Sequence, residues 1–567
     1  MSDLLYEPLK YYESEGRHKH GQNVDEFFSE LHSRSGVNAE ENKKTVAEYR
    51  QKKEKADKLS SKLTGKKTIR VLLFILAAIS LIVAIAGIAN ASALPIILGI
   101  LVTAASLLFI FLKLNKTIKS FTELLLKKRA EADEVLALAY EQMAPLNALF
   151  GEKDTVRLIE KTIPELNFDE YFSHQREAEM KELYGYNPEY DENRSTLDTL
   201  SGEYKGNPFL FERELIHYTG SETYRGYLTI SWTETYRDSK GNLRTRRRTQ
   251  TLTASVTKPK PMYRTDTTLK FFAQGAPDLT FTREGLYHDD KSDKQIERLV
   301  KKGEKQLKKK AQKALEEGKD FTEMANTEFD VLFDALNRDH EVQFRMMFTP
   351  LAQNNMIDLM RSNTGYGDDF DFYKQKRMTI IHSDHAQTWQ MDTEPKNYRS
   401  YDFEEAKSRF KTFNEEFFKS VFFDFAPLFA IPMYHEKPVK SLEPLKEYKV
   451  NYTKNEYETL ANRMDQSLFL AENSATRAIL KANGVQRSGE EDSVEVCAHS
   501  FFGFDRIDYI SVMGGDGRMH PVPVPWIEYV PNERTSYIKV SREVGENEER
   551  TGESSLYYHS LFAKYEN

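Results

Sequence analysis

The sequence predicts an α+β protein, with a transmembrane helical hairpin and a coiled helical stalk attached to a large mixed α+β soluble region rich in antiparallel hairpins. Three observations predict this class. Two uncharged apolar runs of helical length follow each other closely, the flanking segments carry apolar residues at seven-residue spacing, and the remaining chain alternates between helical and strand-like patterns. At 567 residues the chain exceeds the size of one hydrophobic core, so several structural units are expected.

Composition restricts the compartment and the partners. The net charge of −8 is small for a chain of this length, which argues against a nucleic-acid-binding surface over the whole protein. The single cysteine, Cys497, excludes an intramolecular disulfide framework and any multi-cysteine zinc or iron–sulfur site. A reducing compartment fits this cysteine content.

The pattern along the chain predicts seven segments. In order they are a polar N-terminal segment (1–37), a juxtamembrane basic helix (38–70), the transmembrane helical hairpin (71–112), a stalk helix and helical connector (113–186), a β-rich segment with a long hairpin (187–290), an α+β domain (291–447), and a helix followed by a C-terminal antiparallel β region (448–567).

The two apolar runs predict membrane-spanning helices. Val71 to Ala89 is uncharged and its only hydroxyl belongs to Ser80, while the run 93–112 has only Thr103 and Ser106 as polar members. At about 1.5 Å per residue each run spans roughly the 30 Å hydrocarbon core of a bilayer. A buried hairpin in a soluble core is the alternative interpretation.

Small residues recur at helical spacing within these runs. Ala84 stands with Gly87, and Gly99 with Thr103, so the two helices are expected to approach closely. Ordinary apolar filler is the other interpretation. The turn between the runs, residues 90–92, carries no charge.

Basic residues flank both runs, and they set the predicted orientation. The positive-inside rule places both termini in the cytoplasm and makes the chain a two-span protein of the cell membrane. Contact with anionic lipid is expected of these side chains, whereas nucleic acid is not, because no aromatic residues are interleaved with them. The flanking residues are Lys66, Lys67 and Arg70 before the first run, and Lys113, Lys116 and Lys119 after the second.

The stalk is predicted from apolar residues in heptad phase on both sides of the hairpin, which an antiparallel helix pair would bury. Asn38 followed by Glu41 predicts the N-terminal cap of its first helix. The positions are Val46, Tyr49, Ala56 and Leu63 before the hairpin, and Leu114, Ile118, Phe121, Leu125, Ala132, Val135 and Ala139 after it.

A long β-hairpin is predicted where apolar residues alternate with polar ones from Leu228 to Tyr236 and again from Leu252 to Val256. Near its tip a basic cluster could bind phosphate, lipid headgroups or an acidic partner. Cross-strand pairing with Glu234 and Asp238 on a solvated face is the plainer interpretation. The cluster consists of Arg244, Arg246, Arg247 and Arg248.

Four further segments complete the secondary-structure prediction. The Lys-rich run 294–315 predicts an amphipathic helix, lying either on a membrane or partner or in solvent, and the aromatic run 417–425, ended by Pro427, predicts buried core. A helix is predicted around residues 456–483. After it come short strands at 494–496, 506–513 and 518–524, and the alternating prolines at 521, 523 and 525 restrict the last of these to a sheet edge.

Residues 328–360 combine a strand-like start at Phe329, Val331 and Phe333 with a charged run and a helical end. The order FDVLFDALNRDHEVQFRMMFTPLAQNNMIDLM, followed by FYKQKRMTIIHSD, resembles a bacterial membrane-protein family known only as a domain of unknown function. The resemblance is sharpest around Arg345, Thr349 and Pro350. It implies two transmembrane helices ahead of the domain and no particular chemistry.

The same stretch contains interleaved charges. Arg338, Glu341 and Arg345 have the spacing i, i+3 and i+7, so on a helix they would form a salt-bridge ladder. An anion-binding site is the alternative interpretation of these residues.

Few residues suggest catalysis. His382, Asp384 and His385 have side chains suited to zinc or iron, although HSDH also fits a hairpin turn. Cys497 and His499 share a strand face, so a catalytic thiolate–base pair that also involves His520 is one interpretation. A buried neutral cysteine is the alternative. Because GxGxxG, Walker A, GxSxG and kinase motifs are missing from the sequence, no cofactor is expected.

The sequence therefore predicts a non-enzymatic, membrane-anchored cytoplasmic scaffold or protein-interaction module, whose partners are the lipid bilayer and a protein. A homo-oligomer is compatible with this prediction. Two alternatives stay open, namely a membrane-associated enzyme such as a metal-dependent hydrolase, and a membrane protein that binds anionic lipid or nucleic acid.

Overall fold

The computed structural model describes residues 4, 6–89, 93–188, 190–237, 239, 241–285, 293–318, 321–388, 391–439, 452–488, 491–541, 555–558 and 561–566. The predicted turn at 90–92 and Asp238 lie outside the described residues. The chain divides into two compact units. The first comprises Met1–His20, Thr155–Asp392 and Glu416–Asn567, and the second comprises Gly21–Asp154 and Thr393–Glu415.

Helices make up most of the second unit and cover parts of the first. Their bounds are α1 Pro8–Tyr11, α2 Arg17–Ser35, α3 Ala39–Ala89, α4 Ala93–Phe109, α5 Asn115–Leu149, α6 Asp154–Thr162, α7 His174–Tyr184, α8 Asp293–Glu316, α9 Thr327–Phe333, α10 Glu341–Met347, α11 Pro350–Arg361, α12 Asp384–Thr388, α13 Phe403–Phe429 and α14 Lys454–Arg463. Short π- or 3₁₀-helical segments are η1 Tyr12–Gly16, η2 Ile110–Leu114, η3 Pro395–Asn397, η4 Pro432–His435 and η5 Gln466–Leu468.

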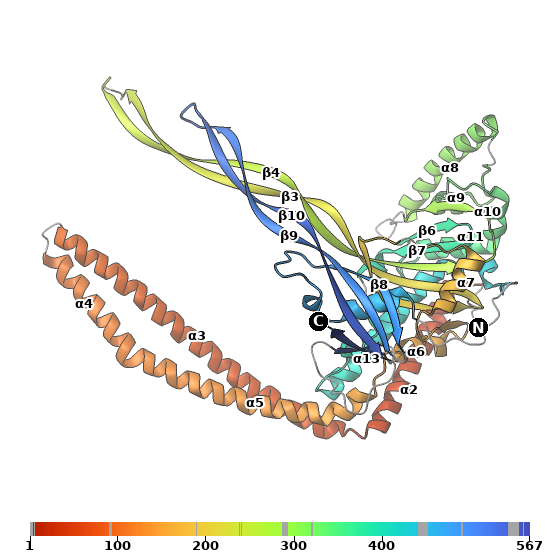
Figure 1. Ribbon diagram of the computed structural model, residues 1–567, viewed down its shortest axis with the longest axis horizontal. Coiled ribbons are helices and arrows are strands. Elements are labelled where there is room, and N and C mark those ends of the chain that lie inside the picture. The colour runs from red at the N-terminus through yellow and green to blue at the C-terminus, as the bar shows by residue number, and fades with distance from the viewer. Residues whose placement is uncertain are drawn as a thin grey trace. The chain divides into compact units, whose positions relative to one another are not determined.

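The second unit is dominated by a helical hairpin in which α3 lies antiparallel to α4 and α5 (Figure 1). The juxtamembrane helix and the first apolar run form one continuous helix of 51 residues. It begins as predicted, since the Asn38 Oδ1 accepts the Glu41 N–H at 3.2 Å. The seven-residue stripes of the stalk meet in its interior, where Ala56, Leu63 and Leu125 are buried.

The first unit contains two antiparallel sheets, as the fold class predicts. Seven strands are ordered β1-β2-β3-β4-β7-β6-β5, and five are ordered β11-β12-β10-β9-β8. Their bounds are β1 Leu166–Phe168, β2 Arg194–Tyr204, β3 Asn207–Arg237, β4 Leu243–Phe272, β5 Thr280–Arg283, β6 Phe370–Gln375, β7 Met378–Ser383, β8 Ile479–Ser488, β9 Glu491–Met513, β10 Met519–Ser541, β11 Ser555–Tyr558 and β12 Leu561–Glu566.

Two strand pairs extend far beyond their sheets. β3 and β4 pair without interruption from Phe209↔Phe271 to Arg237↔Leu243, so the predicted hairpin exists and is much longer than expected. At about 3.3 Å per residue such a ladder is roughly 95 Å long. β9 and β10 form a second ribbon from Ser541↔Glu491 to Met519↔Met513, which merges strands that the sequence predicted as separate pieces.

Two predicted elements are wrong. The strand-like start at Phe329 is instead the helix α9, because the Asn326 side chain caps the Phe329 N–H and Phe329, Leu332 and Phe333 bury one helical face. The helix predicted to reach residue 483 ends at Arg463. After it, β8 pairs with β9 and buries Leu480 and Ala482 in a core beneath α14, so tertiary pairing overrides the local pattern.

Two other helices agree with the sequence. α8 is the Lys-rich helix. Its Leu307 and Ala314 pack against Phe321 and against Val331 of α9, which favours the solvated interpretation. α13 buries its aromatic run, including Phe417 and Phe425, as predicted. The helix continues through Pro427 to Phe429 instead of ending at the proline.

Candidate functional site

The facing sides of the helical hairpin are small and hydroxyl-bearing. The Ser80 and Thr103 hydroxyl oxygens are 2.8 Å apart, and Thr103 also donates to the Ala77 carbonyl at 3.3 Å. A Cβ added at Gly99 would lie 2.6 Å from the Ser80 carbonyl oxygen. Close packing through small residues, predicted from Gly99 and Thr103, is therefore confirmed.

The opposite sides of the same helices expose apolar side chains to the surroundings. The two helices are long and apolar enough to cross a membrane. Hydrophobic side chains that face outward are stable in lipid and costly in water, so this distribution suits a bilayer. They include Ile69, Val71, Leu72, Phe74, Ile75, Leu76, Ile79, Ile82, Ile85, Ile88, Leu94, Ile97, Leu98, Leu101, Leu108, Phe111 and Leu112.

The antiparallel pairing brings both sets of flanking basic residues to one end of the apolar zone. Lys66 stacks its ammonium 5.0 Å from the centroid of the Phe121 ring, and Arg70 donates to Asn115 at 3.5 Å. Lys67, Lys113, Lys116 and Lys119 are exposed. These basic residues form a collar where the hairpin would leave the hydrocarbon core.

The basic cluster of the first ribbon lies at the described end of β4 and is exposed, as predicted. The Nε atoms of Arg246 and Arg248 both donate to one oxygen of Glu234 at 2.9 Å, and Arg247 donates to the Ser231 hydroxyl at 3.1 Å. Pairing with Glu234 is thus confirmed. The segment 231–250 holds six basic and two acidic residues, so the tip, with Arg244 included, has a net positive charge.

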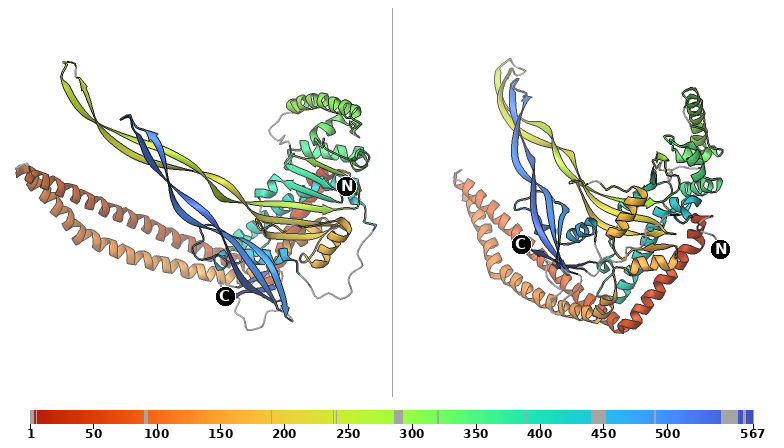
Figure 2. Two further views of the ribbon diagram at one scale, coloured as in Figure 1. Left: turned by 45° about the horizontal axis from the view of Figure 1, so that its top comes forward. Right: turned by 45° about the vertical axis from the view of Figure 1, so that its right-hand side comes forward.

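The two ribbons pack face to face (Figure 2). Leu252 and Ala254 of β4 and Val522 and Val524 of β10 are buried between them. Gly226 permits this contact, because a Cβ there would lie 2.0 Å from the Pro523 carbonyl oxygen. At the turn of the second ribbon the Gly515 N–H donates to the Gln250 side chain at 2.8 Å.

The other side of the second ribbon, which we call the outer face, is apolar and exposed. Ile507, Tyr509, Met513 and Met519 are 55–66% exposed and alternate along the two paired strands. Pro521 and Pro525 border them. Within the part of the chain that the structure describes, β12 pairs with β10 only at Tyr537–Ser541, so the prolines stand there on a strand edge, as predicted. In residues 507–513 apolar side chains occupy both odd-numbered and even-numbered positions, so both faces of this strand are apolar. That pattern is the sequence signal for the outer face.

The structure separates the predicted metal cluster. His382 is the last residue but one of β7, and its Nε2 is 2.8 Å from an Asp266 oxygen. Hydrogen bonds to Asp266 and Asp371 raise the pKa of this imidazole to about 10. Asp384 begins α12, so HSDH is a strand–helix junction and not a hairpin turn. Among the described residues, His382, Asp384 and His385 do not converge on one metal position.

His385 lies in a different, buried carboxylate cluster. Its Nδ1 is 2.7 Å from Asp369, its Nε2 is 3.4 Å from Asp424, and its ring stacks on Tyr366 at 3.9 Å. Burial opposes the charged imidazole, but Asp424 and Asp369 outweigh burial and raise its pKa. Burial also raises the pKa of Asp424 to about 6. The cluster joins α12 to α13.

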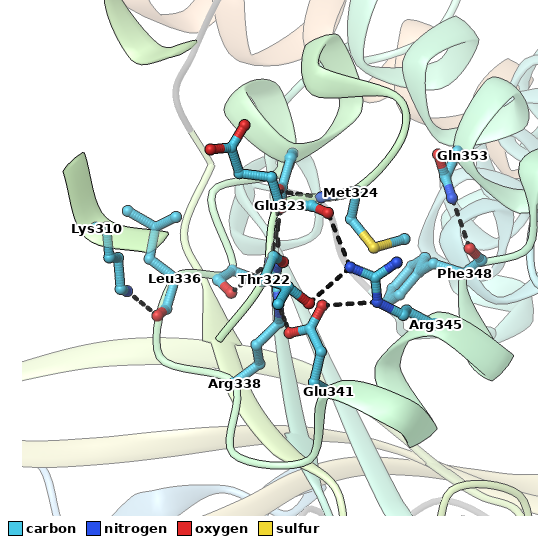
Figure 3. Close-up of polar contacts among 12 residues, drawn as sticks. Lys310, Thr322, Glu323, Met324, Leu336, Arg338, Glu341, Arg345, Phe348 and Gln353 are labelled. Carbon is cyan, nitrogen blue, oxygen red and sulfur yellow. Dashed lines mark hydrogen bonds and ion pairs between the residues drawn. The ribbon is translucent and has the colours of Figure 1, made fainter. Parts of the chain in front are cut away.

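The charged run around Arg338 is a salt-bridge network, as predicted (Figure 3). Arg338 donates to Asp330 at 2.6 Å and to Glu341 at 2.8 Å, and it lies between two aromatic rings. Arg345 donates to Glu341 at 3.1 Å and to Thr322 at 2.7 Å. Arg338 itself precedes α10, so the network joins a loop to a helix.

The sharpest part of the family resemblance has a structural explanation. The Thr349 hydroxyl accepts the Ala352 N–H at the N-cap of α11, and Pro350 occupies the first position of that helix. Both residue types are favoured at these positions. This part of the pattern encodes a helix start.

No pattern in the sequence indicates the polar cavity of about 840 Å³ in the first unit. Residues of α14, β3 and β4 are among those that line it, including the ion pair between Lys270 and the buried Glu212. Asn455 of α14 also donates to Glu212, at 2.7 Å. Burial and the neighbouring Glu212 raise the pKa of Glu214 in the same wall.

Cys497 and His499 lie together, but without His520. The donor atoms of Cys497, His499 and Glu533 all lie within 4.8 Å of one another, whereas His520 pairs with Asp516 at 3.0 Å near the ribbon turn. Burial, followed by the charge of Glu533, raises the pKa of the Cys497 thiol. A thiolate–base pair built on His520 is therefore wrong.

Comparison of the chain with protein-family models, curated proteins and solved structures finds no match. The resemblance to the two-helix bacterial family stays a prediction.

Proposed function

We propose that this protein is a membrane-anchored cytoplasmic interaction module. The observation that carries the proposal is the division of the helical hairpin into a small, hydroxyl-bearing interior and an apolar exterior bounded by a basic collar. This division satisfies the helix backbones and the buried hydroxyls internally while offering lipid only apolar surface. The hairpin is the anchor in this proposal.

The collar also supports the orientation. Because Lys66, Arg70 and the lysines at 113, 116 and 119 gather at one end of the apolar zone, the positive-inside rule assigns that end to the cytoplasm. Both termini and all of the first unit then face the cytoplasm. A reporter that gives the same cytoplasmic signal at both termini would support this orientation, and opposite signals would overturn it.

The outer face of the second ribbon is the proposed partner site. Exposed tyrosine and methionine are typical of protein-binding surfaces, because both bury large apolar areas. Pro521, Pro523 and Pro525 remove the N–H donors of the adjoining edge, so the partner is held by side chains and not by an added strand. The occupant is therefore a protein with an apolar surface of its own.

Photo-crosslinking in cells tests this site. A photoreactive phenylalanine analogue replaces Tyr509, and in the matched control it replaces Tyr227, which is similarly exposed at 61% on the Thr-rich face of the first ribbon. We expect a discrete protein adduct at position 509 that disappears with Met513→Ser and Met519→Ser. Adducts of equal yield at both positions, or at neither, would refute the assignment of this face.

A second candidate function, anionic-lipid contact by the ribbon tip, is favoured by the net positive charge of residues 231–250. Guanidinium groups bind phosphate oxygens well, and exposed Leu243 and Tyr236 add apolar surface beside them. Vesicle binding that falls with salt and needs anionic lipid would support this function.

A further inference from the structure

We propose that Cys497, His499 and Glu533 form a zinc site at the root of the second ribbon. The site is independent of the membrane anchor and of the outer face. It contains the only cysteine of the chain, together with an imidazole and a carboxylate. These are the three ligand types that zinc takes in proteins.

The β9–β10 register holds the three side chains together. His499 pairs directly with Glu533, and Cys497 pairs with Thr535, so Cys497 is two residues from His499 on the same strand face and diagonal to Glu533. The opposite face, at Val496 and Ala498, is buried in the core beneath α14. The ligands therefore project from a fixed sheet surface and not from a loop.

The separation of the His499 and Glu533 donor atoms fits a tetrahedral ion. The His499 Nδ1 and a Glu533 oxygen are 3.3 Å apart, and two ligands that each bind zinc at its usual distance lie roughly 3.4 Å apart in a tetrahedral site. All three donor atoms lie within 4.8 Å of one another. Small side-chain rotations bring such atoms to one ion.

Burial and charge favour a cation here. Cys497 is buried and His499 is half-buried, whereas the Glu533 side chain is 65% exposed and leaves a route from solvent. Lys481, the cross-strand partner of Cys497 on β8, directs its ammonium to Glu458 at 2.8 Å. Three protein ligands leave the fourth position for water or a group from outside, which distinguishes the site from closed structural zinc sites.

Zinc must displace the thiol proton of Cys497. Binding therefore releases a proton, and the affinity rises with pH through the range in which this thiol ionises. The bound ion would join β9 to β10 at the point where the ribbon leaves the five-stranded sheet.

The test uses the untagged full-length protein in detergent micelles, stripped with a chelator and titrated with Co²⁺ as a spectroscopic probe. We expect one Co²⁺ per chain, a thiolate-to-cobalt charge-transfer absorption, and its loss on addition of Zn²⁺. The absorption should disappear in Cys497→Ser. In Glu533→Gln the affinity should fall by at least the ~10–100-fold that loss of an outer-shell partner alone costs.

His520→Asn is the matched control, because it removes another histidine–carboxylate pair of the same ribbon without touching the thiol. A second measurement needs no variant. Zn²⁺ should slow alkylation of Cys497, the single thiol of the chain, in the wild-type protein. Cobalt binding without the charge-transfer absorption, or alkylation that Zn²⁺ leaves unchanged, would overturn the proposal.

Discussion

The helical hairpin α3/α4–α5 and the ribbon β3–β4 are both long and antiparallel, but they satisfy their backbone hydrogen bonds in opposite ways. Each helix satisfies its own backbone hydrogen bonds, so the helical pair needs only a seam of small residues and can stand in lipid. The ribbon satisfies its backbone only across one ladder and keeps open edges. It therefore needs water along its edges and a second ribbon over its apolar face.

Glycine permits the closest approach in both hairpins, although the facing element differs. At Gly99 the nearest atom is the Ser80 carbonyl oxygen of the facing helix, and at Gly226 it is the Pro523 carbonyl oxygen of the facing ribbon. In each case a side chain would meet backbone, which cannot rotate away. The comparison predicts that residues at packing positions determine most of the stability of both hairpins, and that surface charges contribute little to it.

The largest effect is expected in the stalk. Leu125→Ala removes a buried side chain from the seam between α3 and α5 and should lower the free energy of unfolding by about 2–5 kcal/mol. Leu126→Ala is the matched control, because Leu126 is exposed on the same turn. Denaturant unfolding in micelles, followed by circular dichroism, measures both. Equal losses of unfolding free energy in the two variants would contradict the prediction that residues at the heptad positions stabilise the seam.

The ribbon should respond to a much smaller change in volume. Gly226→Ala places a methyl group against the backbone of β10 and should cost about 1–3 kcal/mol by forcing the ribbons apart. Gly220→Ala on the same strand meets only the flexible Met262 side chain and should be far milder. Hydrogen exchange of residues 222–232 reports the separation. Equally fast hydrogen exchange in both variants would show that any substitution of glycine loosens the ribbon, and that the contact between Gly226 and Pro523 has no special role.

How much of each hairpin could be predicted follows from the same contrast. The helical seam is periodic and local, so Ala56, Leu63 and Leu125 were all found from their spacing. The length of the ribbons was not found, because positions such as Thr223 and Thr257 carry β-propensity but lie outside the alternating stretches 228–236 and 252–256. The partner of an apolar strand face is set by tertiary pairing between segments 270 residues apart, as in Leu252 with Val522, and no local pattern encodes it.

The candidate sites also divide into those that local sequence patterns indicate and those that depend on tertiary pairing. The basic collar and the Arg244–Arg248 cluster were visible as runs of charge, and the Arg338 network as a helical spacing. The Cys497–His499–Glu533 cluster was only half visible, because Glu533 joins it through the β9–β10 register. His382 and His385 were grouped wrongly, since a strand end and a helix start direct adjacent side chains to different carboxylates.

A smaller effect is expected inside the membrane-spanning zone. Thr103→Val keeps the shape of the side chain but removes its contacts with Ser80 and the Ala77 carbonyl, and should weaken the helix pair by roughly 1–2 kcal/mol or less. Thr117→Val is the control, because the exposed Thr117 hydroxyl donates only within its own helix, to Lys113. Unfolding in micelles distinguishes them. A greater loss of stability in Thr117→Val than in Thr103→Val would show that the contact between Thr103 and Ser80 does not stabilise the helix pair.

The smallest change in stability, and the most specific change in binding, is expected at the ribbon tip. Glu234 accepts from both Arg246 and Arg248 on an exposed surface, where such pairs contribute at most about 1 kcal/mol, so Glu234→Gln should barely alter unfolding. It removes one negative charge from the tip, however, and near an anionic surface one charge is worth about 1 kcal/mol, or roughly fivefold in affinity. Binding of the micelle-solubilised protein to anionic vesicles should therefore increase by that factor at low salt. Glu222→Gln, which frees Lys260 on the same ribbon far from the tip, is the matched control and should leave vesicle binding unchanged. If the two variants bind alike, the tip is not the lipid contact.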